Sequence, residues 1–472
     1  MPLYLRFPVL ASLFLSLTLA ACAAKNTPGS GYSGPVCQDV ISMPQDLNMY
    51  AYETGVNVPL AAPQEQIAAA GRQKQAFYRP WRAAKPSKWV EQASANNFNM
   101  RPGNAYAKNN RPFPQELWDR IEANTNKGAF GSGHGPGITL RNTNLRAMPT
   151  SEHFYRNPEL PGEGYPFDYF QHSSLHAGTP VYICGISRDG QWLLVESSIT
   201  SGWLPAADIG TTDAPFMQRW EALPLASLVR DNVSIAGTNN HIGTLLPIAG
   251  QAPKGRGHVL SVLFPVAGGS GKADILTEVL PPDTAVSVPL NMTPGEVAKV
   301  GNAMMGQTYG WGGLDQKRDC SALTRDIMAP FGYFLPRNSA AQSKVGTTID
   351  IAGLEPDEKE RAIMREAVPF ASLIWLRGHI GLYTGQYNGN PSMFHNIWGL
   401  RTKGGSGDCS GRAVIGKAVV TSLRPGQERP DLCPSGLLIL RMEKVAVLAS
   451  PSSVAEGSEI SAVSASGSET VQ

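Results

Sequence analysis

The stretch from residue 309 to residue 395 constrains the fold more than any other, because it holds four distinctive patterns in order. Residues 309–313 read Tyr-Gly-Trp-Gly-Gly, and Cys320 stands directly before a segment with apolar residues at helical spacing. Residues 378–383 alternate as a strand bounded by glycines and carry His379, and His395 follows after one short turn. A cysteine at a helix start that faces a strand histidine requires a helix packed on a sheet. The stretch therefore predicts an α+β domain.

The positions of these residues indicate their chemistry. The first turn of a helix carries unpaired N–H groups and the positive end of the dipole, which favour a thiolate over a thiol. We therefore expect Cys320 to be a nucleophile and His379, held on a rigid strand, to be its general base. An imidazole base needs a third polar group to orient it through its other nitrogen, and His395 on the neighbouring strand would do this.

Each of these residues also has a simpler interpretation. A buried cysteine most often only packs, and a histidine on a strand is most often a hydrogen-bonded core residue. Asp319 could serve only as the N-cap of the helix that begins after it. The ordered set as a whole favours catalysis over packing.

With these motifs, residues 291–445 resemble the NlpC family of papain-like cysteine peptidases. Members of that family cleave cell-wall peptides, typically between γ-D-glutamate and a diamino acid. The resemblance implies Cys320 as the nucleophile, His379 as the general base and His395 as the orienting residue. It also implies a papain-like α+β fold for this part of the chain.

The same resemblance implies substrate-binding residues. In members preceded by SH3-like domains, the aspartate beside the cysteine binds the free amine of an N-terminal L-alanine; here that residue is Asp319, with Ser321 in support. Tyr309 and Trp311 belong to the signature and are expected at the cleft. An SH3-like domain contributes an aromatic wall in related enzymes, and Tyr169 is the candidate, with a barrel-core role as the equal alternative.

The sequence departs from the family pattern at two positions beside the nucleophile. Ala322 stands where many members have glycine, and Arg318 stands where a small or apolar residue is common. These departures put the fine shape of the cleft in doubt, and they leave the assignment of the nucleophile unchanged.

Short strands and turns dominate the middle of the chain. Residues 181–186 and 191–195 are apolar runs, and residues 187–190 (Ser-Arg-Asp-Gly) form a turn between them. Together with flanking motifs, this pattern resembles bacterial SH3-like domains; the motifs include Leu145, Arg146, Pro149, Trp192 and Trp203. Residues 212–285 are also strand-like and are interpreted as a second, diverged barrel.

Length and pattern together predict a multidomain chain, because 472 residues exceed what one core usually holds. Helical patterns at residues 64–77 and 114–123 mark the N-terminal part as mainly helical. The expected order is a signal segment (1–22), a linker (23–36), a helical and irregular domain (37–125), two small SH3-like β-barrels (126–211 and 212–285), the papain-like domain (286–446) and a disordered tail (447–472).

The first residues predict export. Arg6 precedes an apolar run of about 15 residues, which is short for a membrane span and suits a secretory signal. The run ends Leu-Ala-Ala-Cys22, which resembles the lipobox of bacterial lipoproteins, in which this cysteine is lipidated. The alternative is an ordinary signal peptide with a chance cysteine. We expect a protein on the periplasmic side, held at the membrane only through lipid on Cys22.

The remaining cysteines and the charge limit cofactors and partners. Cys409 and Cys433 share a Gly/Pro-rich segment and are the favoured disulfide, whereas Cys184 lies in an apolar strand and is expected to be a buried thiol. No zinc-type spacing occurs, so we expect neither metal nor cofactor. A net charge of +2, with both signs mixed along the chain, argues against nucleic acid as a partner. We expect a monomer.

The expected activity is metal-free hydrolysis of murein stem peptides of the type L-Ala-γ-D-Glu-diaminopimelate through an acyl-enzyme. One alternative is an amidase or acyltransferase on the same scaffold, since a fold does not determine a reaction. Another is a non-catalytic, wall-binding lipoprotein in which the SH3-like modules carry the function.

Overall fold

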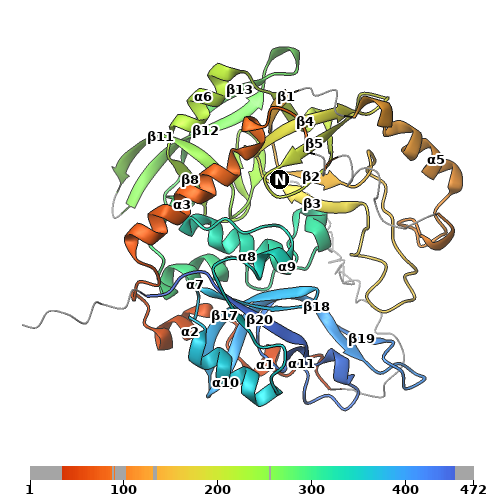
Figure 1. Ribbon diagram of the computed structural model, residues 1–472, viewed down its shortest axis with the longest axis vertical. Coiled ribbons are helices and arrows are strands. Elements are labelled where there is room, and N and C mark those ends of the chain that lie inside the picture. Colours follow the sequence, from red (N-terminus) through yellow and green to blue (C-terminus); the bar gives the residue numbers. More distant parts are fainter. Residues whose placement is uncertain (1–33, 88–89, 91–101, 131–134, 255–256, 452–472) are drawn as a thin grey trace, which may run out of the picture.

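The computed structural model describes residues 34–87, 90, 102–130, 135–254 and 257–451. The expected signal segment with Cys22, most of the linker, and the tail from residue 452 lie outside the described residues. Two β units form the upper half of the view in Figure 1 and an α+β unit forms the lower half, with α8 (Cys320–Met328) between them. Among the described helices, none has the length and apolarity that a membrane crossing needs.

The C-terminal unit is an antiparallel six-stranded sheet with helices packed on it, which confirms the predicted α+β class. The strand order is β15-β20-β16-β17-β18-β19. The strands are β15 (Thr347–Asp350), β16 (Ser372–Leu376), β17 (His379–Tyr387), β18 (Asn390–Thr402), β19 (Gly411–Ser422) and β20 (Met442–Val447). Besides α8, its helices are α7 (Pro294–Asn302), α9 (Ser339–Gln342), α10 (Pro356–Glu366) and α11 (Leu438–Arg441).

The first β unit is a seven-stranded sheet in the order β3-β2-β6-β5-β4-β1-β7. The predicted turn is present, since Gly190 N donates to Ser187 O at 3.0 Å and the flanking strands pair antiparallel. The strands are β1 (Gly135–Thr139), β2 (Thr143–Arg146), β3 (Gln171–Leu175), β4 (Pro180–Ile186), β5 (Trp192–Ser197), β6 (Ser201–Pro205) and β7 (Ile209–Thr211). The short strands and tight turns of the sequence pattern are therefore confirmed here.

The second β unit begins with α6 (Ala214–Ala222) and contains a five-stranded sheet in the order β13-β12-β11-β8-β14, with a separate hairpin β10-β9. Its strands are β8 (Leu225–Leu228), β9 (Val233–Ile235), β10 (Thr238–Asn240), β11 (Leu245–Lys254), β12 (Gly257–Ala267), β13 (Ala273–Leu280) and β14 (Ala285–Ser287). Neighbouring strands are all antiparallel, as expected for a chain punctuated by short turns.

The N-terminal region spreads over the other units and, among the described residues, does not form a core of its own. Its helices are α1 (Asp39–Ser42), α2 (Leu47–Thr54), α3 (Pro63–Phe77) and α5 (Gln115–Asn124). Leu47 and Tyr50 of α2 share one apolar core with Ile327 and Phe394 of the C-terminal unit. A side chain at Gly301 of α7 would overlap Leu47, so this glycine allows the two helices to approach closely.

The cysteines outside the catalytic set behave as the sequence suggested. Cys409 and Cys433, which are separated by 24 positions in the sequence, form a disulfide. This confirms the favoured pairing. Cys184 is a buried free thiol, also as predicted, and Cys37 is buried and free as well. Burial raises the pKa of Cys184 to about 12, so this thiol stays protonated and unreactive.

Candidate active site

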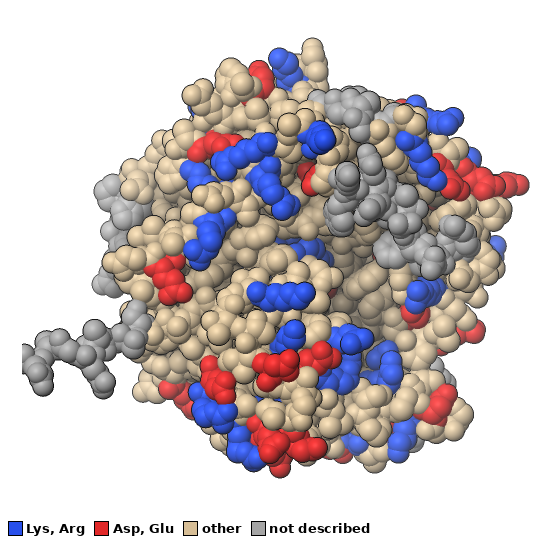
Figure 2. Space-filling view, viewed as in Figure 1, with Lys and Arg blue, Asp and Glu red and all other residues tan. Residues whose placement is uncertain are grey.

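A pocket of about 500 Å³ lies between the C-terminal unit and the first β unit. Figure 2 shows a hollow between the two halves of the molecule, with both signs of charge mixed on the face viewed. The pocket wall brings together residues far apart in sequence, including Gln171, His172, Trp311, Asp319, Cys320, Arg337 and Gly378. The candidate nucleophile therefore faces a cleft that two units build.

Cys320 is the first residue of α8, and Asp319 is the N-cap, whose side chain accepts a hydrogen bond from Ala322 N at 2.9 Å. Asp319 therefore does serve as a helix N-cap, and this role does not exclude a second role in substrate binding. The backbone N–H groups of Ile380 and Ser321 lower the pKa of the Cys320 thiol, opposite to the effect of burial. Since Ile380 follows His379, the start of β17 lies near the nucleophile.

The two predicted histidines are neighbours. His379 Nε2 lies 2.8 Å from His395 Nδ1, and His395 is fully buried on β18. Gly381 makes this approach possible, because a Cβ there would lie 2.9 Å from the Cβ of His395 and would also strike Met393. The second glycine of the Gly-His-Ile-Gly motif therefore has a packing reason.

The pKa values correct one expectation. Burial, with the charge of Asp319 second, raises the pKa of Cys320 to about 12, although Arg337 and the N–H groups of Ile380 and Ser321 act in the opposite direction. Burial, with Arg441 second, lowers the pKa of His379 to about 4. The prediction of a helix-stabilised resting thiolate is therefore wrong, because desolvation outweighs the dipole. The resting pair is a thiol and a neutral imidazole.

Asp319 carries more contacts than sequence reasoning predicted. Arg337 donates from Nη2 to Oδ2 at 2.6 Å and from Nη1 to Oδ1 at 3.0 Å, and Gly312 N donates to Oδ2 at 3.0 Å. Arg337 Nη1 also donates to Ser321 Oγ at 2.7 Å, and Ser321 Oγ to Asp319 Oδ1 at 3.2 Å. Although burial raises the pKa of Asp319, Arg337 lowers it below its usual range, so the carboxylate is ionised.

The aromatic residues of the signature form a cluster at the cleft. Tyr309 and Trp311 line the pocket, and the ring of Phe167 lies 5.9 Å from that of Trp311. The ring of Tyr169 lies 5.2 Å from that of Trp311 at an interplanar angle of 59°, and the Tyr169 hydroxyl donates to Glu163 at 3.0 Å. Tyr169 is thus not among the residues that line the pocket; from the first β unit, β3 contributes Gln171 and His172 instead.

The two glycines after Trp311 have positive φ angles of 64° and 84° and lie against β3. A Cβ at Gly312 would lie 2.5 Å from the carbonyl oxygen of Gln171, and one at Gly313 would strike Ser174. The Trp-Gly-Gly sequence therefore serves two needs, a left-handed backbone and close contact with the first β unit.

Arg318 points away from the cleft, which resolves the doubt about this position. Its guanidinium is buried and pairs with Asp231 of the second β unit at 2.7 Å and with Asp326 of α8 at 2.7 Å. Its carbonyl oxygen accepts from Asn396 Nδ2 at 2.9 Å. Arg318 is therefore anchored to the second β unit through its side chain and to β18 through its carbonyl oxygen. This fixes the backbone just before Asp319 and Cys320.

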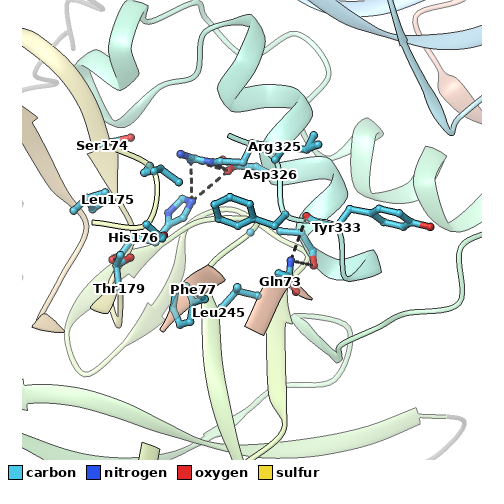
Figure 3. Close-up of a pocket in the computed structure, with 16 residues that line it drawn as sticks. Gln73, Phe77, Ser174, Leu175, His176, Thr179, Leu245, Arg325, Asp326 and Tyr333 are labelled. Atoms are coloured by element: carbon cyan, nitrogen blue, oxygen red, sulfur yellow. Dashed lines mark hydrogen bonds and ion pairs between the residues drawn. The ribbon is translucent and has the colours of Figure 1, made fainter. Parts of the chain in front are cut away.

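A smaller pocket of about 70 Å³ lies on the other side of α8. Figure 3 shows His176, just after β3, pointing toward Arg325 and Asp326 of α8, with Gln73 of α3 and Leu245 of β11 nearby. Burial raises the pKa of Asp326, but Arg325, His176 and Arg318 hold it well below its usual range. This charged cluster joins all three units behind the nucleophile helix.

Within the described residues, no three His, Cys, Asp or Glu side chains gather closely enough to hold a metal ion. The sequence pointed to Cys320, His379, His395 and Asp319, but it offered no signal for Arg337. That arginine lies in a Pro-Arg-Asn loop and reaches the site only through the fold.

Three family models match parts of the chain. Residues 306–407 match the NlpC/P60 family, residues 153–205 match an SH3 domain of the SH3b1 type, and residues 10–130 match the N-terminal NLPC_P60 stabilising domain. These matches cover part of the C-terminal α+β unit, part of the first β unit and the N-terminal region. No curated protein matches the chain.

The comparison with solved structures finds proteins whose names include NlpC. An NlpC/P60 endopeptidase from Photobacterium damselae subsp. piscicida is 24% identical with a TM-score of 0.76, over 87% of this chain and 98% of that one. An NlpC/P60 family protein from Bacillus cereus ATCC 10987 is 14% identical with a TM-score of 0.42, over 67% and 100%. NlpC1 from Trichomonas vaginalis is 12% identical with a TM-score of 0.27, over 66% and 92%. The first of these shares the multidomain fold.

Proposed function

Residues 306–407 belong to the NlpC/P60 family of cell-wall peptidases, and from this premise we propose a specific reaction for the chain. The protein is an exported cysteine endopeptidase that cleaves the bond between γ-D-glutamate and the diamino acid of murein stem peptides. It acts on peptides with a free N-terminal L-alanine and works without a metal.

One observation carries the proposal: Cys320, at the start of α8, lines the cleft, and β17, which contacts α8, begins with His379, which is joined in series to His395. His379 Nε2 lies 2.8 Å from His395 Nδ1. A nucleophile, a base on the neighbouring strand and a group that orients the base are the parts that acyl transfer requires. Burial lowers the pKa of His379, so its ring is neutral at rest and has a free lone pair that can accept a proton.

In the first step, the imidazole of His379 takes the thiol proton as the sulfur of Cys320 attacks the glutamyl carbonyl carbon. The backbone N–H of Cys320 at the start of α8 and the hydroxyl of Tyr309 can stabilise the developing oxyanion. Burial, with nearby Cys320 and Asp319, raises the pKa of Tyr309 well above its usual value, so the phenol keeps its proton for donation.

The imidazolium of His379 then gives its proton to the leaving amine of the diamino acid, and a thioester remains on Cys320. In the second half of the reaction, His379 takes a proton from water as the water oxygen attacks the thioester carbonyl carbon. The imidazolium then returns that proton to the departing sulfur of Cys320, and the glutamyl product is released. The protein ends in its starting protonation state, so no cofactor is consumed.

The substrate amine is assigned to the region of Asp319 and Ser321. Asp319 adjoins the nucleophile and lines the same pocket. Its carboxylate is ionised, and an ammonium two residues before the scissile bond would be attracted to it. Trp311 and Tyr309 supply apolar surface against the peptide.

The test is hydrolysis of L-Ala-γ-D-Glu-diaminopimelate by wild type and by Cys320→Ala. We expect free diaminopimelate from the wild type and none from the variant. Cys184→Ala is the matched control, because that thiol is also buried and free but lies in the first β unit; it should keep full activity. Wild-type turnover in Cys320→Ala would overturn the proposal.

The same experiment separates the rival functions. An amidase would release whole peptides from intact murein and leave the tripeptide uncut, and an acyltransferase would need an added amine acceptor. A wall-binding lipoprotein would show binding to murein and no product with any peptide. The proposal also includes a monomeric protein that is attached to the membrane on its periplasmic side through lipid on Cys22. Cys22→Ala should then move the protein from the membrane fraction to the soluble fraction.

A further inference from the structure

A threonine on β19 touches the end of the histidine pair. The hydroxyl oxygen of Thr421 lies 3.1 Å from His395 Nε2, and its side chain is fully buried. The chain of polar contacts therefore runs from His379 through His395 to Thr421, across three neighbouring strands, β17, β18 and β19.

Counting protons gives this chain a direction. The Thr421 hydroxyl donates to the carbonyl oxygen of Ser422 at 2.7 Å, and a hydroxyl has only one proton to give. Toward His395 the threonine oxygen must therefore accept, which places a proton on His395 Nε2. A neutral imidazole carries one N–H, so His395 Nδ1 is an acceptor. His379 Nε2 must then be the donor across the 2.8 Å contact.

We propose that Thr421 is a positioning residue for catalysis: it holds His395 in the Nε2–H tautomer and so leaves Nδ1 of His379 unprotonated as the base for Cys320. This inference rests on the proposed function for its catalytic consequence, whereas the tautomer itself does not depend on it. Thr421 acts through His395 and touches neither the thiol nor the substrate cleft.

Burial makes the tautomer matter. Burial and the neighbouring His379 lower the pKa of His395 well below its usual value, so the ring cannot carry both protons. If the proton of His395 moved to Nδ1, two N–H groups would face each other at 2.8 Å unless His379 also changed tautomer. That change would place the proton of His379 on the nitrogen needed as the base.

The test uses Thr421→Val, which keeps the shape and removes the acceptor, and Thr421→Ser, which restores the hydroxyl. Thr384→Val is the matched control, since Thr384 is a fully buried threonine on β17 whose hydroxyl contacts Ser392 instead. For Thr421→Val we expect kcat to fall roughly 10- to 100-fold with KM unchanged. This is a smaller loss than that caused by replacing the carboxylate of a catalytic triad, which also leaves the histidine in the wrong tautomer. The serine variant and the control should stay within about threefold of wild type.

A second readout is independent of turnover. In ¹⁵N-histidine-labelled Cys320→Ala protein, NMR should find His395 and His379 both as Nε2–H tautomers, and Thr421→Val should convert His395 to Nδ1–H. Wild-type kcat in Thr421→Val, or an Nδ1–H His395 in the otherwise unchanged protein, would overturn the inference. If the peptide is not hydrolysed at all, the proposed function fails, and the NMR tautomers still decide the role of Thr421.

Discussion

Replacing Asp319 with asparagine tests how the site selects its substrate. The variant removes the charge that we assign to recognition of the free L-alanine amine. Asparagine is itself a good N-cap, so the helix that carries Cys320 should keep its start. The informative quantity is the ratio of kcat/KM for L-Ala-γ-D-Glu-diaminopimelate to that for its N-acetylated form.

The structure sets the expected size of this ratio. A charge-assisted hydrogen bond contributes about 1.5–3 kcal/mol. Asp319 already accepts from Gly312 N, Ala322 N and Ser321 Oγ, and Arg337 pairs with both oxygens. These five donors already exceed the roughly four lone-pair sites of a carboxylate, so the ammonium would share an oxygen that is already hydrogen-bonded and paired. We therefore expect the lower end, about 1.5 kcal/mol or roughly a tenfold preference for the free amine.

The acetylated peptide is the internal control. Any disturbance of the fold, of Arg337 or of the thiol in Asp319→Asn should lower the rates on both peptides alike, whereas loss of amine recognition lowers only one. We expect a ratio near ten in wild type and below about two in the variant. Equal rates on both peptides in wild type would show that Asp319 caps the helix and does not recognise the amine.

Three further predictions concern stability, each measured as the free energy of urea unfolding. Burial lowers the pKa values of His379 and His241 to about 4, so the unfolded chain binds their protons first as pH falls below 6.5. For each histidine, the free energy of unfolding should fall by about 1.4 kcal/mol per pH unit down to about pH 4. A flat stability profile from pH 7 to pH 5 would contradict this. Asp231→Ala leaves the buried Arg318 without one of its partners and should lower the free energy of unfolding by about 3–5 kcal/mol. Arg82→Ala removes a pair whose arginine is 53% exposed and should lower it by less than about 1 kcal/mol. Equal effects of the two variants would refute the reasoning. Cys409→Ser opens a loop of 24 residues and should cost about 3 kcal/mol, matched by reduction of the wild type; no change would show that the bridge adds nothing.

Local patterns predicted elements well because their causes are local. The helix after Asp319 and the strand at His379 follow from apolar spacing within a few residues, and α8 and β17 begin at Cys320 and His379. The N-terminal helices expected at residues 64–77 and 114–123 are found as α3 and α5. Each depends on its own periodicity and caps.

The remaining features depend on contacts that no local pattern encodes. Arg337 reaches Asp319 across 18 positions, and Thr421 reaches His395 through the register of β18 and β19. The pKa of Cys320 is set by burial, which the sequence does not display, so a helix-dipole argument alone gave the wrong resting state. The wall of the cleft is contributed by Gln171 and His172, whereas Tyr169 lies behind Trp311.

The anchoring of Arg318 in the second β unit limits how this enzyme can be recombined. A gene fusion that joined the peptidase from residue 286 onward to a foreign partner would bury no carboxylate in place of Asp231. It would also uncover the core face where Leu47 packs beside Gly301. The family matches divide the chain into separate segments, but the hydrophobic core and the buried ion pair are shared between these segments. A viable exchange must therefore carry the α2 segment and the loop with Asp231 along with the nucleophile.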